Sequence, residues 1–134
     1  LLNNSATKAL VVRVDSPGGA IAVVEEIYEA ILRAQAKGMP VVASMGSTAA
    51  SGGYLVCLPA ERIFANQGSL TGSIGVLLEY SSAKDLFDKV GIKFDTIVSG
   101  EFKGEGGLAS PLTERQRAQL QEVVLDYHEQ FVEP

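Results

Sequence analysis

Ser51 lies at the centre of Met45–Gly53, a run of small residues that follows an apolar, strand-like segment and leads directly into Tyr54. The pattern predicts a strand that ends in a tight turn and places one hydroxyl at the start of a helix. Free backbone N–H groups and the helix dipole favour negative charge at such a position. Alanine and glycine neighbours would let another backbone or a substrate approach the hydroxyl closely. Ser51 is therefore a candidate nucleophile, although a tightly packed structural turn fits this run equally well.

A second candidate site is the turn Ser16–Gly19, which follows a short apolar run and precedes a helical pattern. Ligands bind beyond the carboxyl ends of the strands in open α/β sheets, and both this turn and Ser51 follow a predicted strand. We expect the two loops to be neighbours, with glycine amides able to hold a developing oxyanion. One good donor of this kind contributes about 3–4 kcal/mol. A plain strand-to-helix turn is the alternative, whereas a phosphate loop is disfavoured because no Gly-Lys-Ser/Thr element follows.

A serine nucleophile needs a base, and the chain offers one histidine and several lysines. His128 follows Tyr127 in an amphipathic C-terminal pattern, where a solvent-facing or half-buried position is the expected one. Lysine is an alternative partner for serine in the triad logic. Lys103 follows the predicted strand Lys93–Val98 on a glycine-rich loop, at the same edge of the sheet. We therefore take Lys103 as the candidate base, with an ordinary surface loop lysine as the alternative.

Strands and helices alternate along the chain, which predicts an α/β fold with a largely parallel sheet. Strands are expected over residues 9–14, 41–45, 62–65, 76–80 and 93–98, and helices over residues 20–37, 52–58, 82–90 and 113–131. Asn66–Gly75 is rich in turn-forming residues, and Ser99–Pro111 is expected to be a loop with four glycines. The last helix has the clearest start, because Thr113 and Gln116 form a capping box.

Composition limits the classes of function. The chain has 134 residues, 46% hydrophobic content and a net charge of −5 without basic runs, which makes nucleic acid and anionic membrane surfaces poor partners. No stretch approaches the roughly 20 apolar residues of a membrane span. Cys57 is the single cysteine, and its apolar surroundings in the sequence predict a buried small hydrophobe. No metal and no cofactor is expected.

Four segments resemble, in the same order, those of the bacterial signal peptide peptidase A family. They are DSPGG (Asp15–Gly19), MGSTAASGGY (Met45–Tyr54), TGSIGV (Thr71–Val76) and SGEFK (Ser99–Lys103). Members of that family are Ser–Lys peptidases of the ClpP/crotonase superfamily. The resemblance covers nearly the whole chain, and four motifs in order are specific where any one alone would be weak. It implies repeated β-β-α units with a largely parallel sheet flanked by helices.

The resemblance also implies roles for individual residues. Ser51 would be the nucleophile and Lys103 the general base, while Ser73 would hydrogen-bond the lysine ammonium and help to orient it. The oxyanion hole would be formed by backbone amides of the two glycine turns, namely Gly18 or Gly19 together with Gly52. After Lys103 this chain continues with a looser, glycine-rich linker than the Lys- and acid-rich continuation usual in the family.

Family members assemble into dome-like rings, in which the lysine of short forms can come from a neighbouring subunit. They are anchored in the bacterial cytoplasmic membrane by an N-terminal helix, with the active site outside the cytoplasm. By this resemblance, residues 1–134 would be a single peptidase-domain fragment, soluble by itself, without the anchor and the first strands. Its substrates would be remnant signal peptides or other apolar peptides.

Two other classes of function remain open at this point. One is a crotonase-like protein that binds or hydrolyses acyl-coenzyme A through the same oxyanion geometry, which we rank lower because neither glycine loop offers an obvious acidic hydratase base. The other is a non-catalytic assembly module that keeps the site only in outline. Dependence of peptide hydrolysis on Lys103 would separate the peptidase from both.

Overall fold

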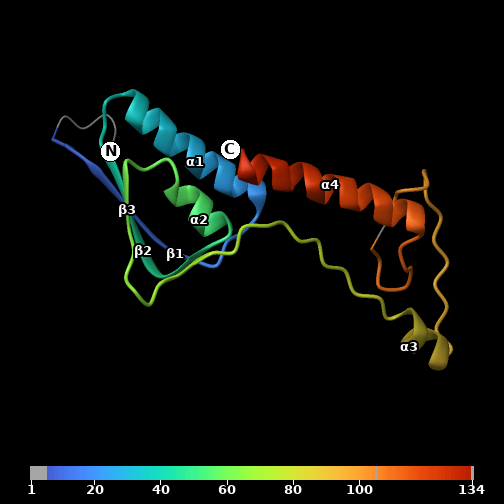
Figure 1. Ribbon diagram of the computed structural model, residues 1–134. Coiled ribbons are helices and arrows are strands. Elements are labelled where there is room, and N and C mark those ends of the chain that lie inside the picture. The colour runs from blue at the N-terminus through green and yellow to red at the C-terminus, as the bar shows by residue number, and fades with distance from the viewer. Residues whose placement is uncertain (1–5, 105, 134) are drawn as a thin grey trace. The chain divides into compact units, whose positions relative to one another are not determined.

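The computed structural model describes residues 6–104 and 106–133. These residues form two compact units, and the boundary between the units lies between Gly75 and Val76. The first unit contains a parallel sheet and two helices, and the second contains two further helices (Figure 1).

The first unit is built around one central strand, β2. β1 (Leu10–Ser16), α1 (Ile21–Ala36) and β2 (Val41–Ala50) form a strand–helix–strand unit, and α2 (Gly52–Cys57), β3 (Arg62–Phe64) and β4 (Leu70–Gly72) follow. β1, β3 and β4 all pair with β2, and every pairing is parallel. β3 pairs with the first half of β2 and β4 with its second half. The mixed α/β architecture with a parallel sheet confirms the predicted fold class.

The core of this unit lies where α2 contacts α1, β1 and β2. Figure 1 shows both helices on the same side of the strands. Burial follows the expected periods, alternating along the first half of β2 and recurring at three- and four-residue spacings in helices. The buried apolar side chains come from each of these elements: Val14, Val24, Ile31, Ala34, Val41, Ala43, Met45, Ala49, Ala50, Leu55, Val56 and Cys57. Full burial of one such Val, Leu or Ile contributes about 1.5–3 kcal/mol.

Two features of the first unit differ from the sequence-based expectation. β2 extends to Ala50 rather than Met45, because its second half pairs with β4. β4 itself lies within Asn66–Gly75, a stretch rich in turn-forming residues for which no strand was predicted. Its three residues, Leu70, Thr71 and Gly72, do not look like a strand in the sequence. The segment becomes one because β2 offers it unpaired backbone groups, which are satisfied by a partner strand.

The second unit contains α3 (Lys84–Lys89) and α4 (Glu114–Val132) and, within its described residues, no strand. The strands predicted over residues 76–80 and 93–98 are therefore wrong. A strand exists only through pairing with another, and neither segment has a partner strand in this unit. Phe94 instead packs its ring against Phe87 of α3, with centroids 4.8 Å apart. The helix predicted over residues 82–90 is present but shorter, with a long 3.4 Å hydrogen bond from Lys84 N–H to Ser82 Oγ before it.

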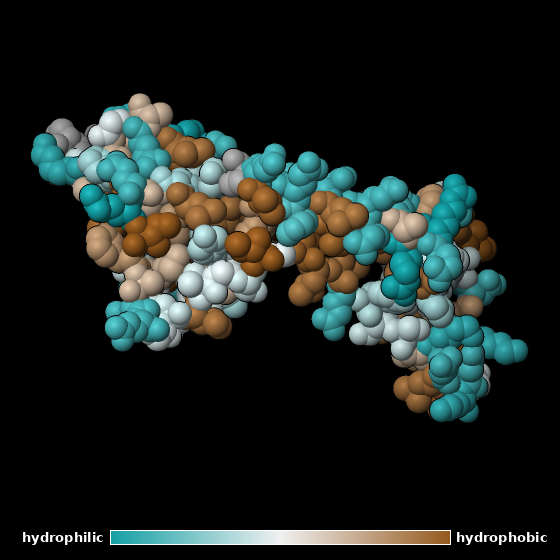
Figure 2. All heavy atoms as spheres, viewed as in Figure 1, coloured by the Kyte–Doolittle hydropathy of each residue, from teal (hydrophilic) through white to brown (hydrophobic). Residues whose placement is uncertain are grey.

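The second unit leaves large apolar side chains at the surface. Leu77 is 82% exposed and Ile97 is 97% exposed, and both come from the segments that lack a strand partner. Figure 2 shows apolar surface in brown among the polar residues on the face in view. No helix among the described residues has the length and apolar character that crossing a membrane requires.

Candidate active site

Ser51 occupies a strained turn between β2 and α2. It is the residue before α2 and has φ 51° and ψ −125°. Its N–H donates to the Gly72 carbonyl at 2.7 Å, and its own carbonyl accepts the N–H groups of Tyr54 and Leu55 at 2.9 and 3.1 Å. Its hydroxyl makes no cap hydrogen bond to the helix, unlike most serines at this position. Both backbone hydrogen-bonding groups of Ser51 thus have partners, while its hydroxyl does not cap the helix.

The strain at Ser51 is shared by one other residue. In the described part of the chain, Ser51 and Ser73 are the only non-glycine residues with positive φ, 51° and 53° respectively. Such a conformation costs of the order of 1–3 kcal/mol and persists only where the surrounding structure enforces it. Strained residues of this kind cluster at functional sites. The strained backbone therefore occurs at Ser51, the candidate nucleophile, and at Ser73, whose role is implied by the family resemblance.

Ser73 is a backbone neighbour of Ser51. β2 and β4 pair from Thr48 with Leu70 to Ala50 with Gly72, and each serine is the next residue after the last pair. The hydrogen bond from Ser51 N–H to the Gly72 carbonyl continues this ladder. Parallel strands therefore bring the two hydroxyl-bearing residues together at the same end of the sheet.

The glycine turn after β1 lies directly against Ser51, as expected. A Cβ atom at Gly18 would stand 2.9 Å from the Cβ of Ser51 and 3.2 Å from its Oγ. Gly18 has φ 123°, which side-chain-bearing residues rarely adopt. Its backbone can approach the hydroxyl only because it has no side chain. The proximity of the two loops is confirmed.

The amides of this turn are not equivalent. Gly18 N–H donates to the Ser16 hydroxyl at 3.2 Å, and that hydroxyl lies at the same distance from the Gly18 carbonyl. No such bond engages the Gly19 N–H in the described part of the chain. Gly19 N would lie 3.4 Å from a Cβ atom at Gly52, so this amide faces the start of α2. Nothing in the sequence pointed to this role of the Ser16 side chain, although serine commonly bonds nearby backbone in turns.

The two glycines after Ser51 allow α2 to pack without space for a side chain. A Cβ atom at Gly52 would meet a methyl group of Val24, and one at Gly53 would stand 2.7 Å from the Ser16 carbonyl oxygen. At the other end of the helix Cys57 is fully buried, and its thiol donates to the Gly53 carbonyl at 3.3 Å. Burial raises the pKa of this thiol. Cys57 is therefore packed and protonated, as predicted, rather than reactive.

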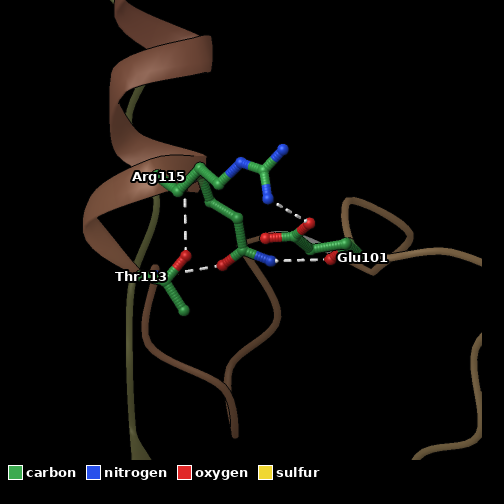
Figure 3. Close-up of polar contacts among 4 residues, drawn as sticks. Glu101, Thr113 and Arg115 are labelled. Atoms are coloured by element: carbon green, nitrogen blue, oxygen red, sulfur yellow. Dashed lines mark hydrogen bonds and ion pairs between the residues drawn. The ribbon is translucent and has the colours of Figure 1, made fainter.

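Lys103 belongs to the second unit and lies in an exposed turn, with its N–H donating to the Gly100 carbonyl at 3.0 Å. The residues before it are tied to the start of α4. Glu101 pairs with Arg115 at 2.7 Å and accepts Gln116 Nε2 on its carbonyl at 3.0 Å. Figure 3 shows this cluster together with Thr113. The turn that carries Lys103 is thereby anchored on a helix, while a partnership of Lys103 with Ser51 stays a prediction.

The capping box predicted for the last helix is confirmed. Thr113 Oγ1 accepts the Gln116 N–H at 3.2 Å, and the Gln116 side chain accepts the Thr113 N–H at 3.0 Å (Figure 3). His128, on the same helix, is exposed, as expected for a residue without a catalytic role. Among the described residues no group of three or more His, Cys, Asp or Glu side chains could hold a metal ion.

Comparison with known protein families identifies one family for most of the chain. Residues 33–134 match peptidase family S49. The chain is 40% identical over 124 residues to a Synechocystis protein named "Putative protease slr0021", covering 92% of this chain and 44% of that protein. It is 42% identical over 90 residues to "Protease 4" of Salmonella typhi, covering 67% of this chain and 15% of that protein.

A third relative carries a more specific name. The chain is 31% identical over 129 residues to "Putative signal peptide peptidase SppA" of Enterococcus faecium, covering 96% of this chain and 38% of that protein. The chain thus spans less than half the length of each of these three relatives.

Proposed function

Because the chain belongs to peptidase family S49, we propose that it carries the nucleophile of a serine endopeptidase and that Ser51 is this nucleophile. One observation supports the assignment above all others. Ser51 is held in a positive-φ conformation at the end of a central strand, its hydroxyl does not cap the helix that follows, and the Gly18 backbone is packed against it. A serine with a purely structural role would gain nothing from this strain.

In the proposed reaction, the Ser51 hydroxyl oxygen attacks the peptide carbonyl carbon while Lys103 removes its proton. The C–N bond then breaks, Lys103 gives the proton to the leaving amine, and the acyl group remains as an ester on Ser51. Water activated by the same lysine hydrolyses this ester and restores the enzyme. Lys103 acts either within its own chain or from a neighbouring subunit of a homo-oligomer. Ser73 would orient the lysine, and its position next to Ser51 supports that role.

The negative charge on the carbonyl oxygen needs donors in the transition state. The Gly52 amide and one amide of the Ser16–Gly19 turn are proposed for this task. Of the two turn glycines, Gly19 suits the role better, because Gly18 N–H already bonds to Ser16 in the free structure. Loss of one such donor costs about 2.7–4 kcal/mol of transition-state stabilisation.

For the substrate we propose remnant signal peptides or other apolar peptides. The name of the Enterococcus faecium relative supports this class. The membrane-facing location that goes with such substrates, outside the cytoplasm and with the full protein anchored, is part of the same proposal.

The test is peptide hydrolysis by the full-length protein, compared among the wild type, Ser51→Ala and Lys103→Ala, with the oligomeric mass determined for each sample. In both variants kcat should fall by more than about 10³-fold, while the oligomeric mass stays that of the wild type. Ser81→Ala and Lys93→Ala are matched controls, because both residues are exposed in the second unit. A fluorophosphonate probe should label the wild type and leave Ser51→Ala unlabelled; labelling of both proteins would contradict the assignment.

A further inference from the structure

β2 changes both its register and its partner halfway along its length. Val14 pairs with Met45, but the next pair on β1 joins Ser16 to Ala49, so β2 advances four positions where β1 advances two. Before this shift β2 pairs with β3, and after it with β4. Irregular pairing is rare between parallel strands, and bulges near active sites re-aim the chain that follows them.

A side chain of β1 holds the shifted segment. The carboxylate of Asp15, which lies between the two registers, accepts the Thr48 N–H at 2.9 Å through Oδ1. The same side chain lies over Gly46, where a Cβ atom would stand 2.6 Å from its Cγ. The Thr48 N–H is one of the backbone donors in the stretch where the ladder is interrupted. A carboxylate oxygen of Asp15 therefore accepts the Thr48 N–H in place of a backbone carbonyl of a partner strand.

Two further side chains hold carbonyl groups of the same segment. Arg13 Nη1 donates to the Met45 carbonyl at 3.0 Å and to the Ser44 hydroxyl at 2.8 Å. Ser69 Oγ donates to the Gly46 carbonyl at 2.7 Å. Together with Asp15, these side chains bond backbone groups of Met45, Gly46 and Thr48, at the start of the register shift and within it. The shifted segment is therefore held by specific hydrogen bonds.

The position of Ser51 depends on this segment. Ser51 comes three positions after Thr48, and the pairs between β2 and β4 run from Thr48 to Ala50, the residue before Ser51. A strand advances about 3.3 Å per residue, and a slip of one residue also exchanges the two faces of the sheet. Either change would remove the Ser51 hydroxyl from the Gly18 turn, which it now contacts.

We propose that Asp15 is a positioning residue: by accepting the Thr48 N–H it holds the shifted register of β2 and so aims the Ser51 hydroxyl at the glycine turn. This inference rests on the proposed function, since it concerns the geometry of the nucleophile. Asp15 does not touch the reacting atoms in this account and acts only through the strand.

The experiment compares Asp15→Ala with Asp15→Asn in the full-length protein. Asp15→Ala should lower kcat by about 10- to 100-fold, the effect of a misplacement near 1 Å, with KM changed less than about threefold. Asp15→Asn keeps a side-chain oxygen that can accept the Thr48 N–H and should retain most of kcat. Glu29→Ala is the control, because it removes another exposed carboxylate, which pairs with Arg33 on the surface of α1.

A second readout does not depend on catalysis. Hydrogen exchange at the Thr48 amide should be faster in Asp15→Ala and in Gly46→Ala, whose methyl group would displace the carboxylate, and unchanged in Asp15→Asn. Wild-type kcat in Asp15→Ala or Gly46→Ala despite faster exchange overturns the inference, as does unchanged exchange in Asp15→Ala. An equal loss of kcat in Asp15→Asn and Asp15→Ala overturns it too, because the charge would then matter and not the acceptor. Hydrolysis that survives in Ser51→Ala would instead refute the proposed function itself.

Discussion

The contact between Gly52 and Val24 gives the sharpest test of how the first unit is packed. Gly52 is the first residue of α2, and Val24 is a buried residue of α1 with 6% exposure. A Cβ atom at Gly52 would stand 2.5 Å from Val24 Cγ2, 3.6 Å from Val24 Cβ and 3.4 Å from Gly19 N. No positive φ is needed at Gly52, so a substitution there is opposed by sterics alone. The steric clash at Gly52 therefore comes from a single methyl group, Val24 Cγ2.

The magnitudes follow from these distances. Gly52→Ala overpacks the contact and should lower the free energy of unfolding by about 1–3 kcal/mol. Val24→Ala removes two buried methyl groups, which costs about 1.6 kcal/mol for transfer and about 2–3 kcal/mol with the cavity included. In the double variant the clash with Val24 Cγ2 is gone, and Gly19 N at 3.4 Å and Val24 Cβ at 3.6 Å remain at ordinary contact distances. The double variant should then be no less stable than Val24→Ala alone, which gives a coupling free energy of about 1–3 kcal/mol.

The assay is urea denaturation of the wild type, both single variants and the double variant at one protein concentration, with linear extrapolation to water. A coupling free energy within about 0.5 kcal/mol of zero would mean that the two substitutions are independent. That result would refute the close approach of α2 to α1 described here.

The same double variant separates stability from catalysis. The double variant should lose less free energy of unfolding than the two single variants lose when their losses are added. The new methyl group, however, still stands 3.4 Å from Gly19 N. If this amide helps to hold the oxyanion, peptide hydrolysis should stay low in Gly52→Ala with or without Val24→Ala. Recovery of hydrolysis together with stability would argue against Gly19 as a donor.

Three further predictions concern single residues. Gly18→Ala combines a φ of 123° with a 2.9 Å approach to Ser51 Cβ and should lower the free energy of unfolding in urea by about 2–5 kcal/mol, whereas Gly19→Ala, with no atom within 4 Å of its Cβ, should change it by less than about 1 kcal/mol. Thr113→Ala removes the capping box and should cost about 1 kcal/mol in thermal denaturation, while Thr113→Ser keeps it. Burial raises the pKa of the Cys57 thiol. The stability that the buried, protonated thiol contributes is therefore fully present below the unfolded thiol pKa of about 8.5 and is lost as the pH rises through the folded pKa. Iodoacetamide at pH 8.5 should accordingly modify the urea-unfolded chain much faster than the native protein.

Local chemistry in the sequence was sufficient for several features of this protein. The capping box at Thr113, the burial of Cys57, and the strand–helix–strand start each depend on residues close together in the chain. The glycine turn and Ser51 could be predicted as neighbours because the carboxyl ends of parallel strands meet at one edge of a sheet. The four motifs also indicated the family to which the chain belongs.

Pairing between strands could not be predicted in the same way. The segments over residues 76–80 and 93–98 contain runs of apolar residues, yet they are not strands, while Thr71, which is followed by a glycine, lies in one. Hydrophobic patterns report which faces of a segment are apolar, whereas a strand requires a partner for its backbone groups. The partner is decided by the whole fold.

Tertiary structure alone decided the conformations on which the candidate site depends. Nothing in the residue types predicts positive φ at Ser51 and Ser73 or the register shift that Asp15 holds in β2. A serine adopts such a strained backbone only when surrounding contacts offset about 1–3 kcal/mol, and these contacts come from β1, β2 and β4 together. The sequence by itself determined which hydroxyl could be the nucleophile, and the packing of three strands determined how that hydroxyl is held.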